Sequence, residues 1–237
     1  MKTVAITGAS GNIGKALQRE LHDRYRLRPI DHALDGIDLR QPDALAGRLD
    51  GCDALIHLAW RYIHPDSRAG HESLDNIEMH RHAVTAAQAA GVPRLLMASS
   101  VHADYFYDWA GPQLIDVDRA PRANGLYGGL KLLVEAIDQD HASDRLRITD
   151  LRYGGVRSDG KPHPRSSWER RVWLSHRDLA SLITAIIEHP DPPNYSRLYA
   201  VSDNVGRVHD LTNDFGWTPQ DSASPLPDEA THDAQTP

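Results

Sequence analysis

The chain has 237 residues, 40% of them apolar, and a formal net charge of −7 from 26 basic and 33 acidic residues. This length suits one α/β domain with a sizeable buried core. Because no block of Lys and Arg and no apolar run near 20 residues occurs, we expect neither a nucleic-acid partner nor a membrane span. The 14 histidines show no metal-ligand spacing, so no metal site is expected. The single cysteine, Cys52, and an N-terminus without a signal-peptide pattern favour the cytoplasm.

Strand-like and helix-like segments alternate along the chain, which is typical of a parallel sheet wrapped by helices. Strands are predicted at Thr3–Thr7, Leu27–Asp31, Ala54–Ala59, Arg94–Ser100, Arg147–Arg152 and Arg197–Ser202. Helices are predicted at Asn12–Arg24, Pro42–Leu49, His71–Ala90, Leu126–His141, His176–Glu188 and Val208–Phe215. The fold class is therefore α/β, a Rossmann-type doubly wound parallel sheet with a small C-terminal substrate-binding portion.

We expect one domain over residues 1–217, in which residues 1–152 mainly bind a nucleotide and residues 153–217 mainly bind the substrate. Residues 218–237 contain four acidic residues, four prolines and no Lys or Arg. Such a segment buries little apolar surface, so we expect a flexible acidic tail.

A glycine-rich turn, Thr7–Gly14, follows the first predicted strand and opens the first predicted helix. In this context, Gly8 permits a tight turn, Gly11 lets the backbone approach a diphosphate, and Gly14 lets helix and strand pack closely. The N–H groups at the helix start then face the anion. The cofactor contacts expected from this turn are Gly8, Ser10, Gly11, Asn12, Ile13 and Gly14.

Asp31 ends the second predicted strand, about 17 residues after Gly14, where a carboxylate can accept hydrogen bonds from the adenosine ribose. A 2′-phosphate at this position would meet like charge, so Asp31 favours NAD over NADP. Arg28 and His32 lie close by in the sequence and act in the opposite direction.

Tyr127 and Lys131 are four residues apart, so on a helix their side chains share one face. A tyrosine normally ionises near pH 10, but a nearby ammonium favours the phenolate. Lys131 is therefore expected to activate Tyr127 as a base. Ser100, at the end of a neighbouring strand, is expected to hydrogen-bond the reacting oxygen.

The glycine spacing, together with Tyr127-x-x-x-Lys131, resembles the extended short-chain dehydrogenase/reductase family, the NAD-dependent epimerase/dehydratase group. The likeness covers about residues 2–217. It implies that Tyr127, Lys131 and Ser100 are catalytic, with Lys131 also binding the nicotinamide ribose. The further cofactor contacts that it implies are Asp38, Leu39, Leu58, Ala59 and Asn76.

Within that family, the chain is most similar to uronate dehydrogenases and to archaeal sugar dehydrogenases that oxidise glucose 6-phosphate. The segments that carry this likeness are Ala98–His102, Asn124–Lys131, Leu151–Gly154 and Trp173–Asp178. Two positions depart from the subgroup, since Val101 replaces an asparagine and Leu130 replaces a serine. The substrate contacts implied are Ser100, Val101, His102 and Arg170, with Arg165 and Arg171 as alternatives to Arg170.

These residues predict an NAD-dependent oxidoreductase in which Tyr127 takes a proton while hydride passes to NAD from a small free sugar, a uronic acid or a sugar phosphate. Two alternatives stay open: a sugar epimerase that retains its NAD, and a catalytically weak NAD-binding regulatory protein. Gly128 and Gly129, beside the catalytic pair, motivate the second alternative, because glycine weakens a helix. The resemblance also implies a homodimer formed through helices 71–90 and 124–141.

Overall fold

A computed structural model describes residues 1–61, 73–109 and 113–226. Within these residues, six strands form one parallel sheet in the order β2-β1-β3-β4-β5-β6. The strands are β1 (Thr3–Thr7), β2 (Arg26–Ile30), β3 (Ala54–His57), β4 (Arg94–Ser100), β5 (Arg147–Tyr153) and β6 (Tyr195–Ala200). The helices are α1 (Asn12–Leu21), α2 (His32–Asp35), α3 (Asp75–Ala89), η1 (a 3₁₀ turn, Val101–Ala103), α4 (Gly125–His141), α5 (Ser167–Arg171) and α6 (His176–Glu188). The predicted Rossmann-type α/β fold is confirmed.

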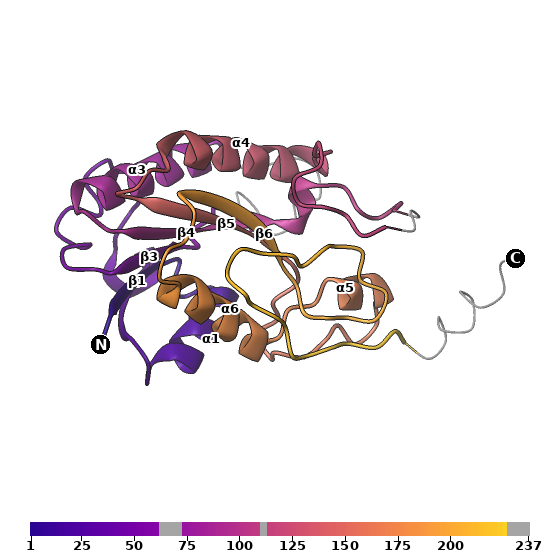
Figure 1. Cartoon of the computed structure of the whole chain (residues 1–237). Helices are drawn as coiled ribbons and strands as arrows, with labels where there is room; N and C mark the ends of the chain where they lie inside the picture. Colours follow the sequence, from indigo (N-terminus) through magenta and orange to yellow (C-terminus); the bar gives the residue numbers. More distant parts are fainter. Residues whose placement is uncertain (62–72, 110–112, 227–237) are drawn as a thin grey trace, which may run out of the picture.

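The helices form two layers, with α1 and α6 on one face of the sheet and α3 and α4 on the other (Figure 1). The strand order reverses next to β1, because β2 lies on one side of it and β3 and the later strands lie on the other. Such a reversal opens a crevice at the carboxyl ends of the strands, where ligands of doubly wound sheets bind. No helix in the described parts of the chain is both long and apolar enough to cross a bilayer.

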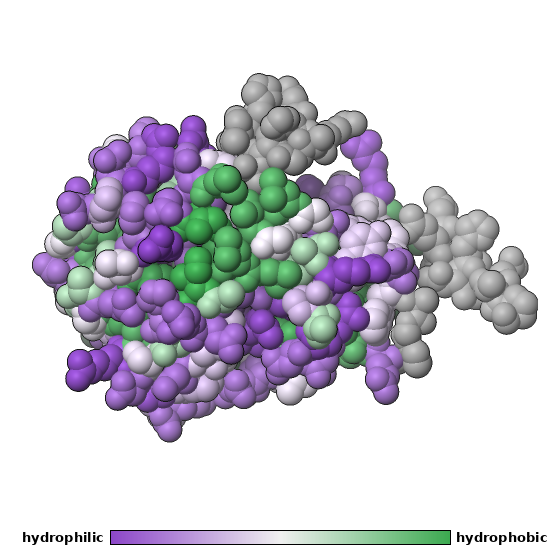
Figure 2. All heavy atoms as spheres, turned by 90° about the horizontal axis from the view of Figure 1, so that it is seen from above, coloured by the Kyte–Doolittle hydropathy of each residue, from purple (hydrophilic) through white to green (hydrophobic). Residues whose placement is uncertain are grey.

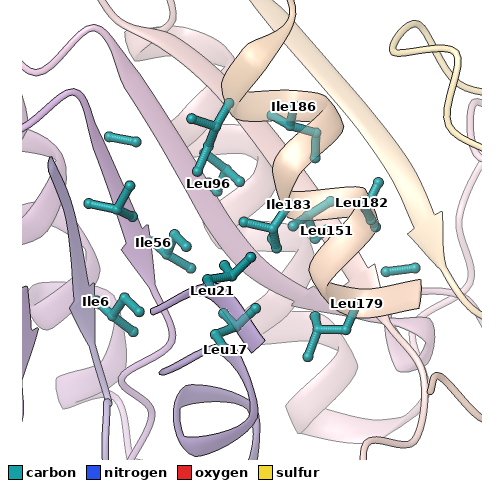
Figure 3. Close-up of a cluster of buried hydrophobic side chains, with 14 of the residues drawn as sticks. Ile6, Leu17, Leu21, Ile56, Leu96, Leu151, Leu179, Leu182, Ile183 and Ile186 are labelled. Atoms are coloured by element: carbon teal, nitrogen blue, oxygen red, sulfur yellow. The ribbon is translucent and has the colours of Figure 1, made fainter. Parts of the chain in front are cut away.

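An apolar core joins the sheet to α1 and α6 (Figure 3). Leu17 and Leu21 lie four residues apart on α1, as do Leu179 and Ile183 on α6, so each pair points from one helical face toward the sheet. The strand residues that they meet are Ile6, Ile56, Leu96 and Leu151. This packing fixes the start of α1, and with it the glycine turn, against the sheet.

The predicted helix Pro42–Leu49 is wrong, since this segment forms consecutive turns. Its hydrogen bonds join residues three apart, as in Arg48 N–H to Leu45 O, and Gly47 has a positive φ of 67°. A left-handed residue ends a right-handed helix. Leu45 and Leu49 are nevertheless buried, so the apolar spacing reflected burial rather than a helix.

The predicted helix Val208–Phe215 is also wrong, because its backbone groups have partners elsewhere. The amide of Ile115 donates to Val208 O at 2.6 Å, and the amide of Asp210 donates to Ile115 O at 2.9 Å. Asn213 Oδ1 then accepts from the amides of Phe215 and Trp217. Tertiary pairing therefore overrides local helix propensity here.

The flexible tail expected from residue 218 needs a correction for residues 218–226. The amides of Gln220 and Asp221 donate to the Asp178 carboxylate at 2.7 and 3.0 Å. Ala223 is buried, and its amide donates to Asn204 Oδ1 at 3.0 Å. Asp221 also pairs with Arg177. The low apolar content of this segment does not reveal that hydrogen bonds hold it against the rest of the chain. Residues 227–237 lie outside the described residues.

The predicted Thr3–Thr7, Arg94–Ser100 and His176–Glu188 elements occur with the predicted bounds, and the other elements have bounds shifted by a few residues. The predicted Leu27–Asp31 and Arg197–Ser202 strands are Arg26–Ile30 and Tyr195–Ala200, and the predicted Ala54–Ala59 strand ends at His57. The helix predicted from His71 begins at Asp75. Asp31 leaves the sheet because its side chain caps α2, accepting from the Ala33 amide.

Candidate active site

The glycine turn has the close approaches that were predicted for it. Gly8 has a φ of 69°, and a Cβ there would lie 2.7 Å from the amide nitrogen of Ala59. A Cβ on Gly14 would lie 2.7 Å from Ala9 Cα. Only glycine fits such positions. Gly11 caps α1 without any side-chain hydrogen bond, which leaves the first-turn amides facing the crevice.

Beside this turn lies a cavity of about 340 Å³, here called the nucleotide cavity. It is lined by Gly8, Ile30, Asp31, His32, Ile37, Asp38, Leu39, Arg40, Ala59, Trp60, Arg61 and Met79. Five of these were predicted cofactor contacts: Gly8, Asp31, Asp38, Leu39 and Ala59. Because Gly8 of the glycine turn lines this cavity, one extended ligand can occupy the cavity and contact the turn.

The two carboxylates of the nucleotide cavity are held in fixed orientations. Asp31 accepts hydrogen bonds from the amides of Ser10 at 3.0 Å and Ala33 at 2.9 Å. Partial burial opposes ionisation, but the bonds from Ser10 and Ala33 lower the pKa of Asp31 below its usual value. Asp38 forms a two-pronged pair with Arg40, which lowers the pKa of Asp38 to about 2. Both carboxylates are therefore ionised at neutral pH.

The nucleotide cavity also has basic lining residues, of which sequence analysis missed Arg40 and Arg61. Arg40 and Arg61 both approach Asp75 of α3, and His32 follows Asp31 directly. Arg28, by contrast, turns away and donates to the carbonyls of residues 48 and 50. The sequence signal for Arg40 and Arg61 as lining residues is that each lies just after a segment of predicted cofactor contacts.

Asn76 does not line this cavity, although it was a predicted cofactor contact. It is buried, accepts a hydrogen bond from the Arg61 amide at 2.7 Å and donates to Arg61 O at 2.9 Å. Asn76 thus fixes the backbone that follows β3, and it acts on the cavity through Arg61.

A second cavity, of about 510 Å³ and here called the catalytic cavity, opens at the carboxyl ends of β3, β4 and β5. It is lined by Ile13, Leu58, Trp60, Ala98, Ser99, Ser100, Val101, His102, Tyr127, Lys131, Tyr153 and Gly154. All three predicted catalytic residues are among them. Trp60 lines both cavities, so the two are neighbouring parts of one crevice.

Tyr127 and Lys131 lie on the first two turns of α4. Lys131 is 3% exposed, and its ammonium donates to Ala98 O at 2.6 Å and lies 5.7 Å from the centre of the Tyr127 ring. The indole of Trp60 covers the same ammonium at 3.4 Å and meets the Tyr127 ring edge-on, with centroids 5.7 Å apart. The charge of Lys131 is thus held beside Tyr127 in a largely apolar site, where its effect is strong.

The segment that follows β4 completes this wall. Ser100 Oγ accepts from the His102 amide at 3.2 Å, and the His102 ring lies 5.9 Å from that of Tyr127. Burial lowers the pKa of His102, so its imidazole is neutral at pH 7. Gly128 is required here, because a Cβ would collide with His102 O, and the glycine lets α4 contact this segment.

The predicted arginine contacts do not line the catalytic cavity. Arg170 donates to the carbonyls of His163, at 3.0 Å, and Ser224. Arg171 packs on Trp168 at 4.6 Å, and Arg165 is exposed. Sequence analysis also missed Trp60 and Tyr153. Trp60 directly follows the predicted contacts Leu58 and Ala59, and Tyr153 ends β5 beside the predicted contact Ser100 of β4.

A comparison with known proteins assigns the family. The profile described as the NAD dependent epimerase/dehydratase family matches residues 4–172. The chain belongs to this family. The family membership that the sequence predicted is therefore confirmed, and it indicates NAD as the cofactor of the crevice.

Similar proteins within the family are sugar dehydrogenases. L-arabinose 1-dehydrogenase (NAD(P)(+)) of Haloferax volcanii is 27% identical, over 94% of this chain and 98% of its own. NAD-dependent glucose-6-phosphate dehydrogenase of the same organism is 27% identical, over 93% and 94%. The crystal structure of uronate dehydrogenase from Agrobacterium tumefaciens matches with a TM-score of 0.78 at 26% identity, over 100% of this chain and 90% of that one. The predicted likeness to these subgroups is confirmed.

Proposed function

We propose that the protein is an NAD-dependent oxidoreductase that oxidises a small free sugar, a uronic acid or a sugar phosphate. The observation that carries this proposal is the catalytic cavity, in which Ser100, Tyr127 and Lys131 line the same space as Ile13 of the glycine turn. Three elements far apart in the sequence thus meet where a dinucleotide and a sugar hydroxyl would meet. The proposal is also supported by the similarity of this chain to proteins named as sugar dehydrogenases.

In the proposed mechanism, Tyr127 takes the proton of a sugar hydroxyl while the hydrogen on the same carbon leaves as hydride. NAD, when bound, supplies the hydride acceptor. Lys131 stabilises the phenolate of Tyr127 by its charge, and Ser100 donates a hydrogen bond to the reacting oxygen. The carbon becomes a carbonyl, the proton passes to Tyr127, and two electrons leave with the hydride.

We assign the cofactor to the whole crevice. The diphosphate would lie on the amides of the turn formed by Gly8, Ser10, Gly11, Asn12, Ile13 and Gly14. The adenosine would fill the nucleotide cavity, with Asp31 on its ribose and Asp38, Leu39 and Ala59 around the base. Leu58, Tyr127 and Lys131 would contact the nicotinamide riboside, and Ser100, Val101 and His102 the sugar.

We propose NAD rather than NADP as the preferred form. Asp31 is ionised and would repel a 2′-phosphate. Arg40 weakens this preference only in part, because its guanidinium is neutralised by Asp38. The solved complex of a uronate dehydrogenase variant similar to this chain contains NAD.

The test is a panel of aldoses, uronic acids and sugar phosphates, assayed for NADH formation with NAD and NADP in parallel. Tyr127→Phe should lower kcat by roughly 10²–10⁴-fold, the usual contribution of a positioned acid or base. Purified enzyme that retains NAD and interconverts sugars without net reduction would indicate the epimerase instead. Full activity of Tyr127→Phe would exclude the mechanism.

We further propose a homodimer formed through α3 and α4. Figure 2, which views this face, shows apolar surface gathered at its centre. Leu126 and Leu133 of α4 are 47% and 46% exposed there. Leu133→Arg should shift the protein from dimer to monomer in analytical ultracentrifugation, whereas Leu34→Arg, at a leucine of α2 that is 58% exposed, should not. A monomeric wild type would refute this proposal.

We propose the cytoplasm as its location, because NAD is available there and the buried thiol of Cys52 stays reduced.

The division into residues 1–152 for NAD and 153–217 for substrate is likewise a proposal. It would be supported if substitutions in the second part changed KM for the sugar and left NAD binding unaffected.

A further inference from the structure

Tyr153, the last residue of β5, has a buried hydroxyl group without a hydrogen-bond partner among the described residues. The side chain is 5% exposed and lines the catalytic cavity, beside Ser100 in the register of β4 and β5. Among the described residues, no group lies within hydrogen-bonding distance of its hydroxyl. Burial raises the pKa of Tyr153 far above its usual value, so the group is a neutral phenol that can donate.

A buried hydroxyl without a partner is unfavourable, and phenylalanine would provide the same ring without that cost. The ring itself packs in the apolar cluster formed with α1 and α6, where a hydroxyl contributes nothing. Because Tyr153 lines the catalytic cavity, its unpartnered hydroxyl points to a polar ligand that completes its hydrogen bonding.

The side of the sheet identifies which part of the ligand this is. Tyr153 and Ile13 belong to the same apolar cluster, on the side of α1, whose N-terminus holds the glycine turn. Tyr127 and Lys131 reach the cavity from α4, on the opposite side. A nicotinamide ring that follows a diphosphate on the glycine turn would enter beside Ile13, which lines the catalytic cavity, and the polar substituent of that ring is the carboxamide.

We propose that the Tyr153 hydroxyl hydrogen-bonds the carboxamide of nicotinamide and so orients the ring toward the sugar. This inference rests on the proposed function, since it requires NAD in the crevice. Tyr153 is thus a cofactor-positioning residue that acts from the side of the sheet opposite to Tyr127.

The experiment compares NAD with ADP-ribose, which has the same adenosine, diphosphate and ribose but no nicotinamide. Binding of each to wild type and to Tyr153→Phe is measured by calorimetry. Tyr153→Phe should bind NAD about 2- to 10-fold more weakly, as expected for one neutral hydrogen bond, and ADP-ribose equally well. The melting temperature of the variant without ligand should equal or exceed that of wild type.

Tyr25→Phe is the matched control, because Tyr25 is also buried but donates to Glu188 far from either cavity. It should leave both affinities unchanged. Equal NAD affinity of wild type and Tyr153→Phe would overturn the inference alone, and so would a higher KM for the sugar with unchanged NAD affinity. Parallel loss of ADP-ribose binding would show a structural effect and also overturn it. A wild type that binds neither ligand would refute the proposed function as well.

Discussion

The two faces of the sheet hold their helices by different means. On one face, α6 packs through Leu179, Leu182, Ile183 and Ile186, with apolar strand residues opposite (Figure 3). On the other face, α4 buries acidic side chains against β5. The alternation of β5 produces this difference, because Leu151 and Tyr153 point to the first face while Asp150 and Arg152 point to the second.

The centre of the polar face is a buried ion pair. Arg152 donates to both oxygens of Glu135 at 2.9 and 2.8 Å, and neither residue is more than 2% exposed. Burial opposes ionisation of Arg152, but the Glu135 carboxylate raises the pKa of Arg152 above its usual value. Ser99, at the end of β4, and Arg197, of β6, also bind Glu135.

A carboxyl pair lies next to this ion pair. Asp138 of α4 pairs with His80 Nε2 at 2.9 Å, and Asp150 accepts from the Tyr195 hydroxyl at 2.7 Å. Burial raises the pKa of Asp138 to about 8, and burial together with the neighbouring Asp138 raises the pKa of Asp150. The pair therefore holds a proton at neutral pH.

The two faces of the sheet contribute differently to stability and to the geometry of the site. On the α6 side, apolar contacts depend on the volume and shape of the side chains, so they tolerate small shifts of the helix. Directional bonds on the α4 side fix the rotation and depth of the helix that carries Tyr127 and Lys131. Stability depends on both faces, whereas the positions of Tyr127 and Lys131 depend on the polar one.

The largest expected effect comes from breaking the ion pair. Arg152→Met leaves the Glu135 charge buried without its main partner and should lower the free energy of unfolding by about 3–5 kcal/mol. The double variant Glu135→Leu/Arg152→Met removes both charges and should be more stable than the single variant. Urea unfolding at pH 7 measures both, and a double variant less stable than the single one would contradict the argument.

A cavity on the apolar face should have a comparable effect on stability but not on chemistry. Leu182→Ala should lower the free energy of unfolding by about 2–5 kcal/mol, through lost burial and the space left behind. Its kcat per folded molecule should stay near that of wild type. Urea unfolding and kinetics at a temperature where the variant is folded test this, and a large fall in kcat of the folded Leu182→Ala variant would remove the distinction between the faces.

A smaller effect, dependent on pH, is expected from His209. The ring is fully buried between Tyr199, at 4.4 Å, and Phe106, at 5.1 Å, and burial lowers the pKa of His209 to about 3. Below about pH 6.5 the unfolded chain takes up a proton that the folded chain does not, so stability falls as the pH falls toward 3. At pH 5 this contribution is a loss of about 2 kcal/mol.

His209→Phe removes this titration and keeps an aromatic ring in place. The drop in the free energy of unfolding between pH 7.5 and pH 5 should therefore be smaller in the variant than in wild type. The buried histidines His57 and His80 are present in both proteins and cancel in the comparison. Identical pH dependence in the two proteins would show that His209 does not contribute.

Much of the site was predictable because its signals are local. The glycine spacing of residues 8–14 specifies a turn that only glycine can form, and the four-residue spacing of Tyr127 and Lys131 places them on one helical face. The end of β4 at Ser100 was also predictable, and parallel strands bring their carboxyl ends to one edge. Ser100 was found in this way, whereas Leu58 and His102 came from the family resemblance.

Other features follow from contacts between distant segments, which local sequence does not encode. Whether Val208–Phe215 forms a helix depends on Ile115, and whether residues 218–226 are docked depends on Asp178. The positions of Arg170 and Trp60 are likewise set by distant partners, Ser224 and Lys131. The sequence alone determined the fold class and the placement of Tyr127 and Lys131 on one helical face, because both arise from short-range periodicity. Only the tertiary structure decided which side chains meet across the crevice, because hydrogen bonds and burial join residues without regard to their separation in the chain.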